Sequence, residues 1–101
     1  MTPDEYYRDA TKRNIGIVSR AEQDVLRGAR VGIVGMGGAG GIYLTTLVRM
    51  GIGRFHISDF DTFSVVNINR QAGAMSSTIG RPKAEVMAEI ARDIHPAGSR
   101  W

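Results

Sequence analysis

The sequence contains no cysteine, and aromatic side chains make up only 7% of its 101 residues. Without cysteine, these residues can form no disulfide, no thiolate zinc site and no cysteine nucleophile. The first ten residues, MTPDEYYRDA, are acidic and polar, so they are neither a secretory signal nor a transit peptide. No dense basic block of the kind found in nucleic-acid-binding or membrane-binding tails is present. These absences predict a cytoplasmic protein that binds neither nucleic acid nor a membrane.

The longest run without a charged residue is the 18 residues 31–48. That length is close to the length of a short membrane-spanning helix. The run, however, holds six glycines and two threonines and lacks aromatic residues on both flanks. We therefore interpret it as a buried strand, a glycine turn and a buried helix.

The remaining composition is that of a globular protein, with 43% apolar residues and a net charge of +3. The length of the chain suggests at most one small domain. Two helix starts precede the uncharged run, and each carries the pattern of a capping box. TPDE predicts a helix from Pro3 to about Lys12, with Thr2 as its cap. SRAE predicts a second helix that ends near Gly28, with Ser19 as its cap.

Alternating strands and helices follow. The run RVGIVG predicts a buried parallel strand, GIYLTTLVRM a helix that ends before Gly51, and RFHISD a second strand that stops at Asp59. A long polar connection leads to a last helix, from Pro82 to about Ile94, whose apolar stripe is Met87, Ile90, Ala91 and Ile94. This order predicts an α/β protein with a doubly wound, Rossmann-like parallel sheet. With only two clear strands the sheet is incomplete, and helices precede it.

The glycine turn GMGGAG matches the pattern G-x-G-x-x-G between a strand and a helix. Gly35 would permit the tight turn, Gly37 the approach of a phosphate, and Gly40 close packing of the helix on the strand. Asp59 ends the second strand, where a carboxylate can accept hydrogen bonds from a ribose. The glycines could also serve packing alone, and Asp59 could cap a loop. A nucleotide site is the stronger interpretation, but this pattern does not separate NAD from ATP.

Polar side chains crowd the connection after the second strand, in DFDTFSVVNINRQ and GRPKAEV. Asp61 lies two residues beyond Asp59, and the amide side chains of Asn67, Asn69 and Gln71 surround Arg70. An arginine can grip phosphate oxygens with two parallel hydrogen bonds, and Lys83 adds a point charge at the start of the last helix. Such a set suits a triphosphate that is attacked at its α-phosphate, whereas a dehydrogenase has no need of it.

The glycine turn, the segment ISDFDTFSVVNINRQ and the downstream GRPK together resemble the adenylation domain of the ThiF/MoeB/HesA and ubiquitin-activating enzyme superfamily. The segment KRNIGIVSRAEQDVLRGARV is similar to the N-terminal helices of that family. The resemblance runs from about Tyr6 to Pro96. It implies that residues 1–29 form an arm that serves a dimer or its active site, and that residues 30–101 form the N-terminal part of an ATP-binding adenylation domain.

The resemblance also implies a reaction. With Mg²⁺ and ATP, the enzyme adenylates the C-terminal carboxylate of a ubiquitin-like or sulfur-carrier protein and releases pyrophosphate. By position, Asp59 would hold the ribose, Asp61 would help to position Mg²⁺, and Arg13 would act across the interface of a homodimer or heterodimer. Asn67, Arg70 and Lys83 would contact the phosphates. The turn that lines the phosphates and adenosine comprises Gly35, Gly37, Gly38, Ala39, Gly40 and Gly41.

Three departures from the family pattern keep alternatives open. The sequence lacks the third strand with its later metal-binding aspartate, the acceptor cysteine and the zinc cysteines. We therefore expect either the N-terminal part of a longer protein or a non-catalytic, dimerising subunit that depends on a partner. An NAD-dependent oxidoreductase half-domain would use only the glycine turn and Asp59. His56 alternates with apolar neighbours and is interpreted as structural, because metal sites need clustered donors.

Overall fold

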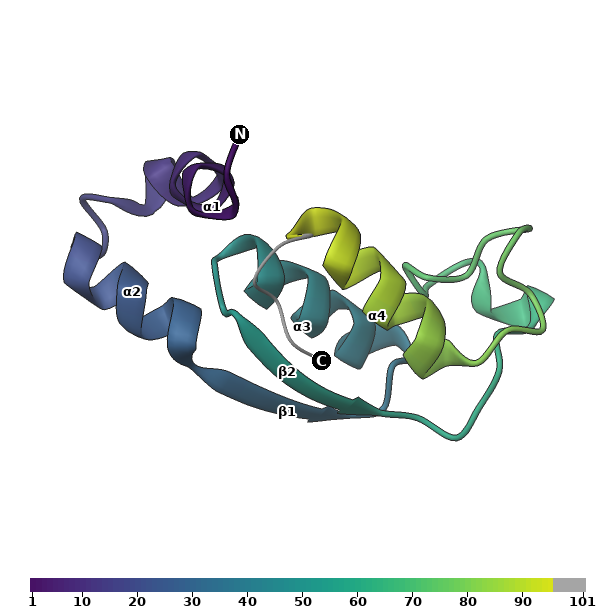
Figure 1. Cartoon of the computed structure of the whole chain (residues 1–101). Coiled ribbons are helices and arrows are strands. Elements are labelled where there is room, and N and C mark those ends of the chain that lie inside the picture. The colour runs from purple at the N-terminus through teal and green to yellow at the C-terminus, as the bar shows by residue number, and fades with distance from the viewer. Residues whose placement is uncertain (96–101) are drawn as a thin grey trace.

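A computed structural model describes residues 1–95 of the chain, so the last six residues of the predicted segment 30–101 lie outside the described residues. The helices α3 and α4 lie side by side over one face of a small sheet, and α1 and α2 lie at one end of the molecule (Figure 1). In chain order the elements are α1 Pro3–Thr11, η1 Lys12–Asn14, α2 Arg20–Gly28, β1 Arg30–Val34, α3 Gly38–Arg49, β2 Arg54–Ser58, η2 Val65–Asn67 and α4 Lys83–Ile94.

Both predicted capping boxes are present. The hydroxyl of Thr2 accepts a hydrogen bond from the amide of Glu5, and the Glu5 carboxylate accepts one from the amide of Thr2. Ser19 and Glu22 form the same reciprocal pair at the start of α2. Each pair satisfies amide groups that a helix end otherwise leaves unpaired. Each helix start is therefore determined by a pair of residues that lie three positions apart in the sequence.

The sheet consists of β1 and β2, which pair in parallel with Arg30 opposite Arg54 and Val34 opposite Ser58. The predicted strands and their parallel pairing are confirmed. The prediction that the first strand is buried is wrong for one face of β1, since Val34 is 89% exposed. The reason is that α3 and α4 cover the same face, and no helix of residues 1–95 covers the other (Figure 1).

The core lies between this sheet and the two helices that cover it. The predicted stripe of α4 is confirmed, because Met87 and Ala91 are fully buried and Ile90 and Ile94 pack against the core. The helix α3 is only half buried, contrary to prediction, since Tyr43 is exposed to solvent. No helix within residues 1–95 is both long and apolar enough to cross a membrane.

A buried hydrogen-bond network fastens the N-terminal helices to the rest of the chain. The hydroxyl of Tyr7 donates to the carbonyl of Gly51 over 2.6 Å and accepts from Nε2 of Gln23 over 2.9 Å. Burial raises the pKa of the Tyr7 hydroxyl, so it remains a neutral donor. Gly51 has a φ of +101°, and a Cβ there would lie 2.3 Å from Gln23 Nε2. The turn before β2 therefore needs glycine at position 51, because a side chain there would overlap Gln23 and Tyr7.

We expect Tyr7→Phe to lower the free energy of unfolding by about 1–2 kcal/mol, because the change leaves a buried carbonyl without its donor. Urea denaturation measures the difference. Tyr43→Phe is the matched control, since Tyr43 is 60% exposed and its hydroxyl makes no hydrogen bond within residues 1–95. Equal losses in the two variants would show that this network does not hold the arm.

Candidate functional site

The glycine turn connects the end of β1 to the start of α3. Gly35 adopts a φ of +89°, and its amide donates to the carbonyl of Ser58 over 2.8 Å. A Cβ on Gly40 would lie only 1.7 Å from the carbonyl oxygen of Gly35. The predicted reasons for these two glycines, a positive φ and a close approach, are therefore confirmed. Their contact with a nucleotide stays a prediction.

The helix α3 begins earlier than predicted, at Gly38, so the second half of the glycine turn is its first helical turn. Its cap residue, Gly37, has no side chain that could bond to the first amides. Unpaired amides at a helix N-terminus and the helix dipole together attract an anion. The local geometry thus offers a phosphate-sized group a set of backbone donors.

Asp59 holds the glycine turn in place. One carboxylate oxygen accepts a hydrogen bond of 2.6 Å from the amide of Met36, and the other accepts one of 2.7 Å from the amide of Asp61. This is the loop-capping role that was the alternative to ribose binding. A carboxylate has about four acceptor positions, so these two bonds leave room for a ribose hydroxyl as well. The structure therefore gives Asp59 a positioning role, and ribose binding stays a prediction.

A shallow depression of about 250 Å³ opens where the two strands end. Phe60 stands on its rim and is fully exposed, which is uncommon for so large an apolar side chain. Its position beside the glycine turn and Asp59 makes it a surface on which a flat ring could lie. The sequence analysis did not single out Phe60. The lining residues are Val34, Gly35, Ser58, Asp59, Phe60 and Asp61.

The loop that carries NINRQ lies against the glycine turn. A Cβ on Gly37 would lie 3.5 Å from Nε2 of Gln71, and one on Gly38 would lie 3.9 Å from the carbonyl oxygen of Arg70. Gln71 is buried, and its Oε1 has no hydrogen-bond partner within residues 1–95. The loop that carries Arg70 and Gln71 thus adjoins the glycine turn, and a shared site stays a prediction. Gln71 was not among the predicted site residues, although it belongs to the same run.

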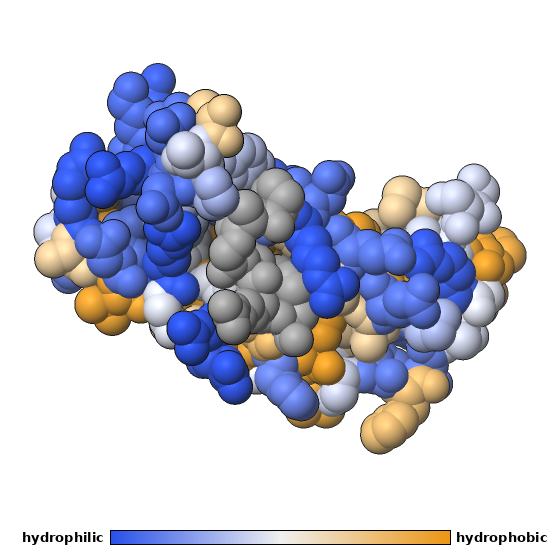
Figure 2. Space-filling model, viewed as in Figure 1, coloured by the Kyte–Doolittle hydropathy of each residue, from blue (hydrophilic) through white to orange (hydrophobic). Residues whose placement is uncertain are grey.

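Two of the predicted phosphate-binding side chains are bonded to their own loop. Oδ1 of the buried Asn67 accepts from the amide and the hydroxyl of Ser64, so this side chain shapes η2. Arg70 is exposed, and its Nη1 donates to the carbonyl of Val66 over 3.1 Å. Of these two side chains only Arg70 is charged, and it is exposed to solvent. The exposed apolar residues of this loop include Val65, Val66 and Ile68. Figure 2 shows some hydrophobic side chains among polar ones at this end of the molecule.

Lys83 is buried at the first position of α4, with only 8% of its surface exposed. Its amide donates to the carbonyl of Asp61 over 3.0 Å, and its Nζ lies 5.7 Å from the centre of the Phe63 ring. No carboxylate within residues 1–95 forms an ion pair with this ammonium group. A solvated surface position, the alternative weighed for a single lysine, is therefore wrong. A lysine whose side chain is mostly buried and has no carboxylate partner is one that a phosphate would stabilise.

Arg13 does not join this site. It is exposed in η1, at the end of the molecule that carries α1, whereas the glycine turn lies toward the opposite end (Figure 1). The long axis of the molecule measures 41 Å. The structure thus keeps Arg13 apart from the glycine turn of its own chain, and its action across a dimer interface stays a prediction.

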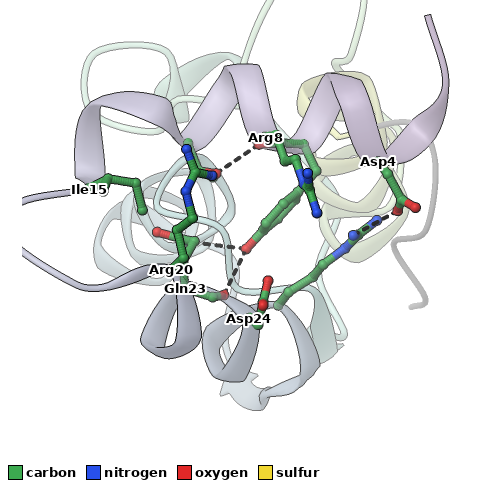
Figure 3. A pocket seen from close by; sticks show the side chains of 9 residues that line it. Asp4, Arg8, Ile15, Arg20, Gln23 and Asp24 are labelled. Atoms are coloured by element: carbon green, nitrogen blue, oxygen red, sulfur yellow. Dashed lines mark hydrogen bonds and ion pairs between the residues drawn. The ribbon is translucent and has the colours of Figure 1, made fainter.

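A second cavity, of about 120 Å³, lies between α1 and α2 (Figure 3). Arg27 spans one side of it, with Nη1 2.8 Å from the Asp4 carboxylate and its guanidinium 4.5 Å from the centre of the Tyr7 ring. The sequence did not predict this cavity. Its polar lining fastens α1 to α2, and it has no connection to the glycine turn.

Comparison with known proteins decides the family. The model of the ThiF family matches residues 11–99. The chain belongs to the ThiF family. Among curated relatives, it is 46% identical over 71 residues to a tRNA threonylcarbamoyladenosine dehydratase of Haemophilus influenzae, a match that covers 70% of the chain and 27% of the relative. It is 39% identical over 74 residues to a molybdopterin-synthase adenylyltransferase of Salmonella typhimurium, covering 73% and 30%.

Among solved structures, the Escherichia coli tRNA N6-threonylcarbamoyladenosine dehydratase TcdA in complex with ATP superposes with a TM-score of 0.91 at 32% identity. That match covers 99% of this chain and 41% of the dehydratase. The chain therefore spans less than half the length of these relatives. The family and the Rossmann-like fold predicted from the sequence are confirmed, while the roles of the individual site residues stay predictions.

Proposed function

We propose that this chain is the nucleotide-binding part of an enzyme that uses ATP to adenylate a carboxylate. The observation that carries this proposal is the mostly buried side chain of Lys83, which has no ion pair within residues 1–95, at the end of the fold that holds a glycine turn with free helix amides. The ATP-bound structure of a relative that shares nearly the whole of this fold supports the nucleotide. An NAD-dependent oxidoreductase is disfavoured, because such an enzyme has no use for Arg70 and Lys83.

Each residue would then have a defined task. The amides at Gly35 to Gly41 would receive the phosphates, Asp59 the ribose, and Phe60 the adenine ring. Asn67, Arg70 and Lys83 would face the phosphates that carry the growing charge. A substrate carboxylate oxygen attacks the α-phosphorus, the bond from that phosphorus to its leaving oxygen breaks, and pyrophosphate departs. Since the nucleophile is already ionised, the site acts by orientation and by neutralising charge, without a general base.

Magnesium fits this site as a companion of the nucleotide. No group of three metal-binding side chains exists within residues 1–95. Magnesium is commonly held by one or two carboxylates together with water and the phosphates themselves. Asp61, with Asp59 two residues before it at the end of β2, meets that requirement. When bound there, the ion would offset phosphate charge, and the protein residues would fix its place.

The substrate carboxylate is the finer part of the proposal. The resemblance implied the C-terminus of a ubiquitin-like or sulfur-carrier protein, and a relative named an adenylyltransferase is consistent with that class. A second candidate is a carboxylate carried by tRNA, because the relative with 46% identity is named for threonylcarbamoyladenosine, whose threonyl group ends in a carboxylate. Activation by AMP is the step that both substrates would share. We also propose that a second chain supplies Arg13 to this site.

Calorimetric titration of the chain with MgATP, and with NAD in parallel, tests the proposal. We expect ATP to bind and NAD not to bind. Arg70→Ala should weaken ATP at least tenfold, because a charge-assisted contact to phosphate contributes about 1.5–3 kcal/mol. Arg92→Ala is the control, since Arg92 is exposed on α4. Binding of NAD alone, or equal ATP affinity in the two variants, would refute the proposed site.

A further inference from the structure

The ring of His95 lies where α1 meets the ends of α3 and α4. His95 follows the last residue of α4 directly, and only 4% of its surface is exposed. Its ring centre lies 5.7 Å from that of Tyr6 and 5.5 Å from that of Tyr7, which are neighbours on α1. A hydrogen bond joins its imidazole to the backbone of Val48 on α3. Three helices therefore enclose a side chain of the type that changes its charge near neutral pH.

The same two tyrosines hold α1 on the rest of the chain. The hydroxyl of Tyr6 donates a hydrogen bond of 2.7 Å to the carbonyl of Ile94, the residue before His95. The hydroxyl of Tyr7 donates to the carbonyl of Gly51, in the turn between α3 and β2. Both bonds and both ring contacts thus come from two adjacent residues. Because the interior is closely packed, a shift of the imidazole would disturb all four contacts together.

The charged groups around the ring come from three helices, while α1 contributes the two tyrosines. Arg27 on α2 and Arg49 at the end of α3 are basic, and Asp93 on α4 is acidic and lines one groove with Arg49 and His95. Burial is the largest cause that lowers the pKa of the His95 imidazole, and the two arginines lower it further, while the hydrogen bond with Val48 opposes them. The pKa is lowered although a carboxylate lies in the groove, so the junction favours the neutral ring.

The ring of Tyr7 offers a protonated His95 little support. A cation binds to the face of an aromatic ring. The guanidinium of Arg27 already lies 4.5 Å from the centre of the Tyr7 ring. A protonated His95 would bring a second cation to that ring, and the two would repel each other. Protonation therefore favours a state in which the imidazole leaves the junction and reaches water.

We propose that protonation of His95 releases α1 from α3 and α4, so that the docking of the N-terminal helix responds to pH. This switch lies apart from the glycine turn and does not depend on the proposed function. In the released state the ring reaches water, where its pKa returns to the ordinary value of about 6.5. Since the pKa is lower in the docked state, α1 is held most firmly above about pH 6.5 and less firmly as the pH falls below that value.

Amide hydrogen exchange of the full chain, followed by NMR at about pH 7.5 and about pH 5.5, tests the switch. After correction for the intrinsic exchange rates, the amides of α1 should open up to about tenfold more at the lower pH, because a ring with a pKa of about 6.5 is about ten parts protonated to one part neutral there. The amides of β1 should open at most about twofold more. In the same samples, the ring signals of His95 should titrate below about pH 6.5.

Two variants separate His95 from other causes of a pH response. His95→Gln removes the titrating ring, so α1 should open equally at the two pH values. His56→Gln is the matched control, because it removes the other of the two histidines, which is exposed on β2. This control should keep the pH response of the parent chain.

Four results would each overturn the proposal. In the parent chain, they are a His95 ring that titrates at or above about pH 6.5, an α1 that opens equally at the two pH values, and equal increases of opening in α1 and β1, which would mean that the whole chain unfolds. The fourth is a pH response of α1 that persists in His95→Gln. The first three results need no variant, so the test decides even where His95→Gln does not fold.

Discussion

Gly40→Ala is expected to lower the free energy of unfolding by about 3 kcal/mol or more, in line with the largest effects of overpacking against backbone. The added Cβ would lie 1.7 Å from the carbonyl oxygen of Gly35 and 2.8 Å from its carbonyl carbon. Backbone atoms cannot swing aside as a side chain can, so β1 and α3 would have to separate. Since a domain of this size is stable by about 5–15 kcal/mol, a loss of about 3 kcal/mol would remove roughly one fifth to three fifths of its stability. Urea denaturation followed by circular dichroism measures the effect.

Gly28→Ala is the matched control for this change. Gly28 is the last residue of α2, it has no positive φ, and nothing lies within 4 Å of the place where its Cβ would stand. Alanine there should leave stability unchanged or raise it by up to about 1 kcal/mol, because alanine restricts the unfolded chain and favours the helix. If Gly40→Ala unfolded at the same urea concentration as Gly28→Ala, the close contact between α3 and the turn would be absent in solution.

Lys83→Met should change two measurements in opposite directions. Without nucleotide the variant should be as stable as the parent chain or more stable, because a mostly buried lysine without an ion pair is replaced by an apolar side chain of similar length. In the ATP complex, the same change would remove a cation from the phosphates. We expect ATP affinity to fall by about a hundredfold, which corresponds to about 2.7 kcal/mol. Urea denaturation and calorimetric titration measure the two quantities.

Lys12→Met is the control, since Lys12 is the other lysine of the chain and lies exposed in η1. It should leave ATP affinity within twofold of the parent. A variant at Lys83 that loses stability and retains ATP affinity would show that the ammonium group serves the fold. The same two measurements on Arg70→Ala provide a comparison with Lys83. Arg70 is exposed and contributes no core packing, so its loss should lower ATP affinity without a change in stability.

The sequence by itself determined the features that depend on neighbouring residues. Two capping boxes predicted the starts of α1 and α2, because each joins residues only three positions apart. The glycine turn was predicted with its strand and its helix, since a positive φ and a missing Cβ are properties of single residues. Motif order, from the glycine turn through Asp59 and Arg70 to Lys83, was enough to predict the family.

Contacts between distant segments were decided only by the tertiary structure. Asp59 reaches back 23 positions to bond with Met36, and Gln71 comes to lie beside Gly37. The sequence likewise did not show that Lys83 is buried, because burial depends on the ring of Phe63, 20 positions before it. Within residues 1–95, one face of the sheet is uncovered because α3 and α4 lie on the same side of it (Figure 1). Local hydrogen bonds and the steric limits of single residues depend on neighbouring positions in the sequence, so the sequence predicts them. Burial and charge pairing depend on which surfaces the folded chain brings together.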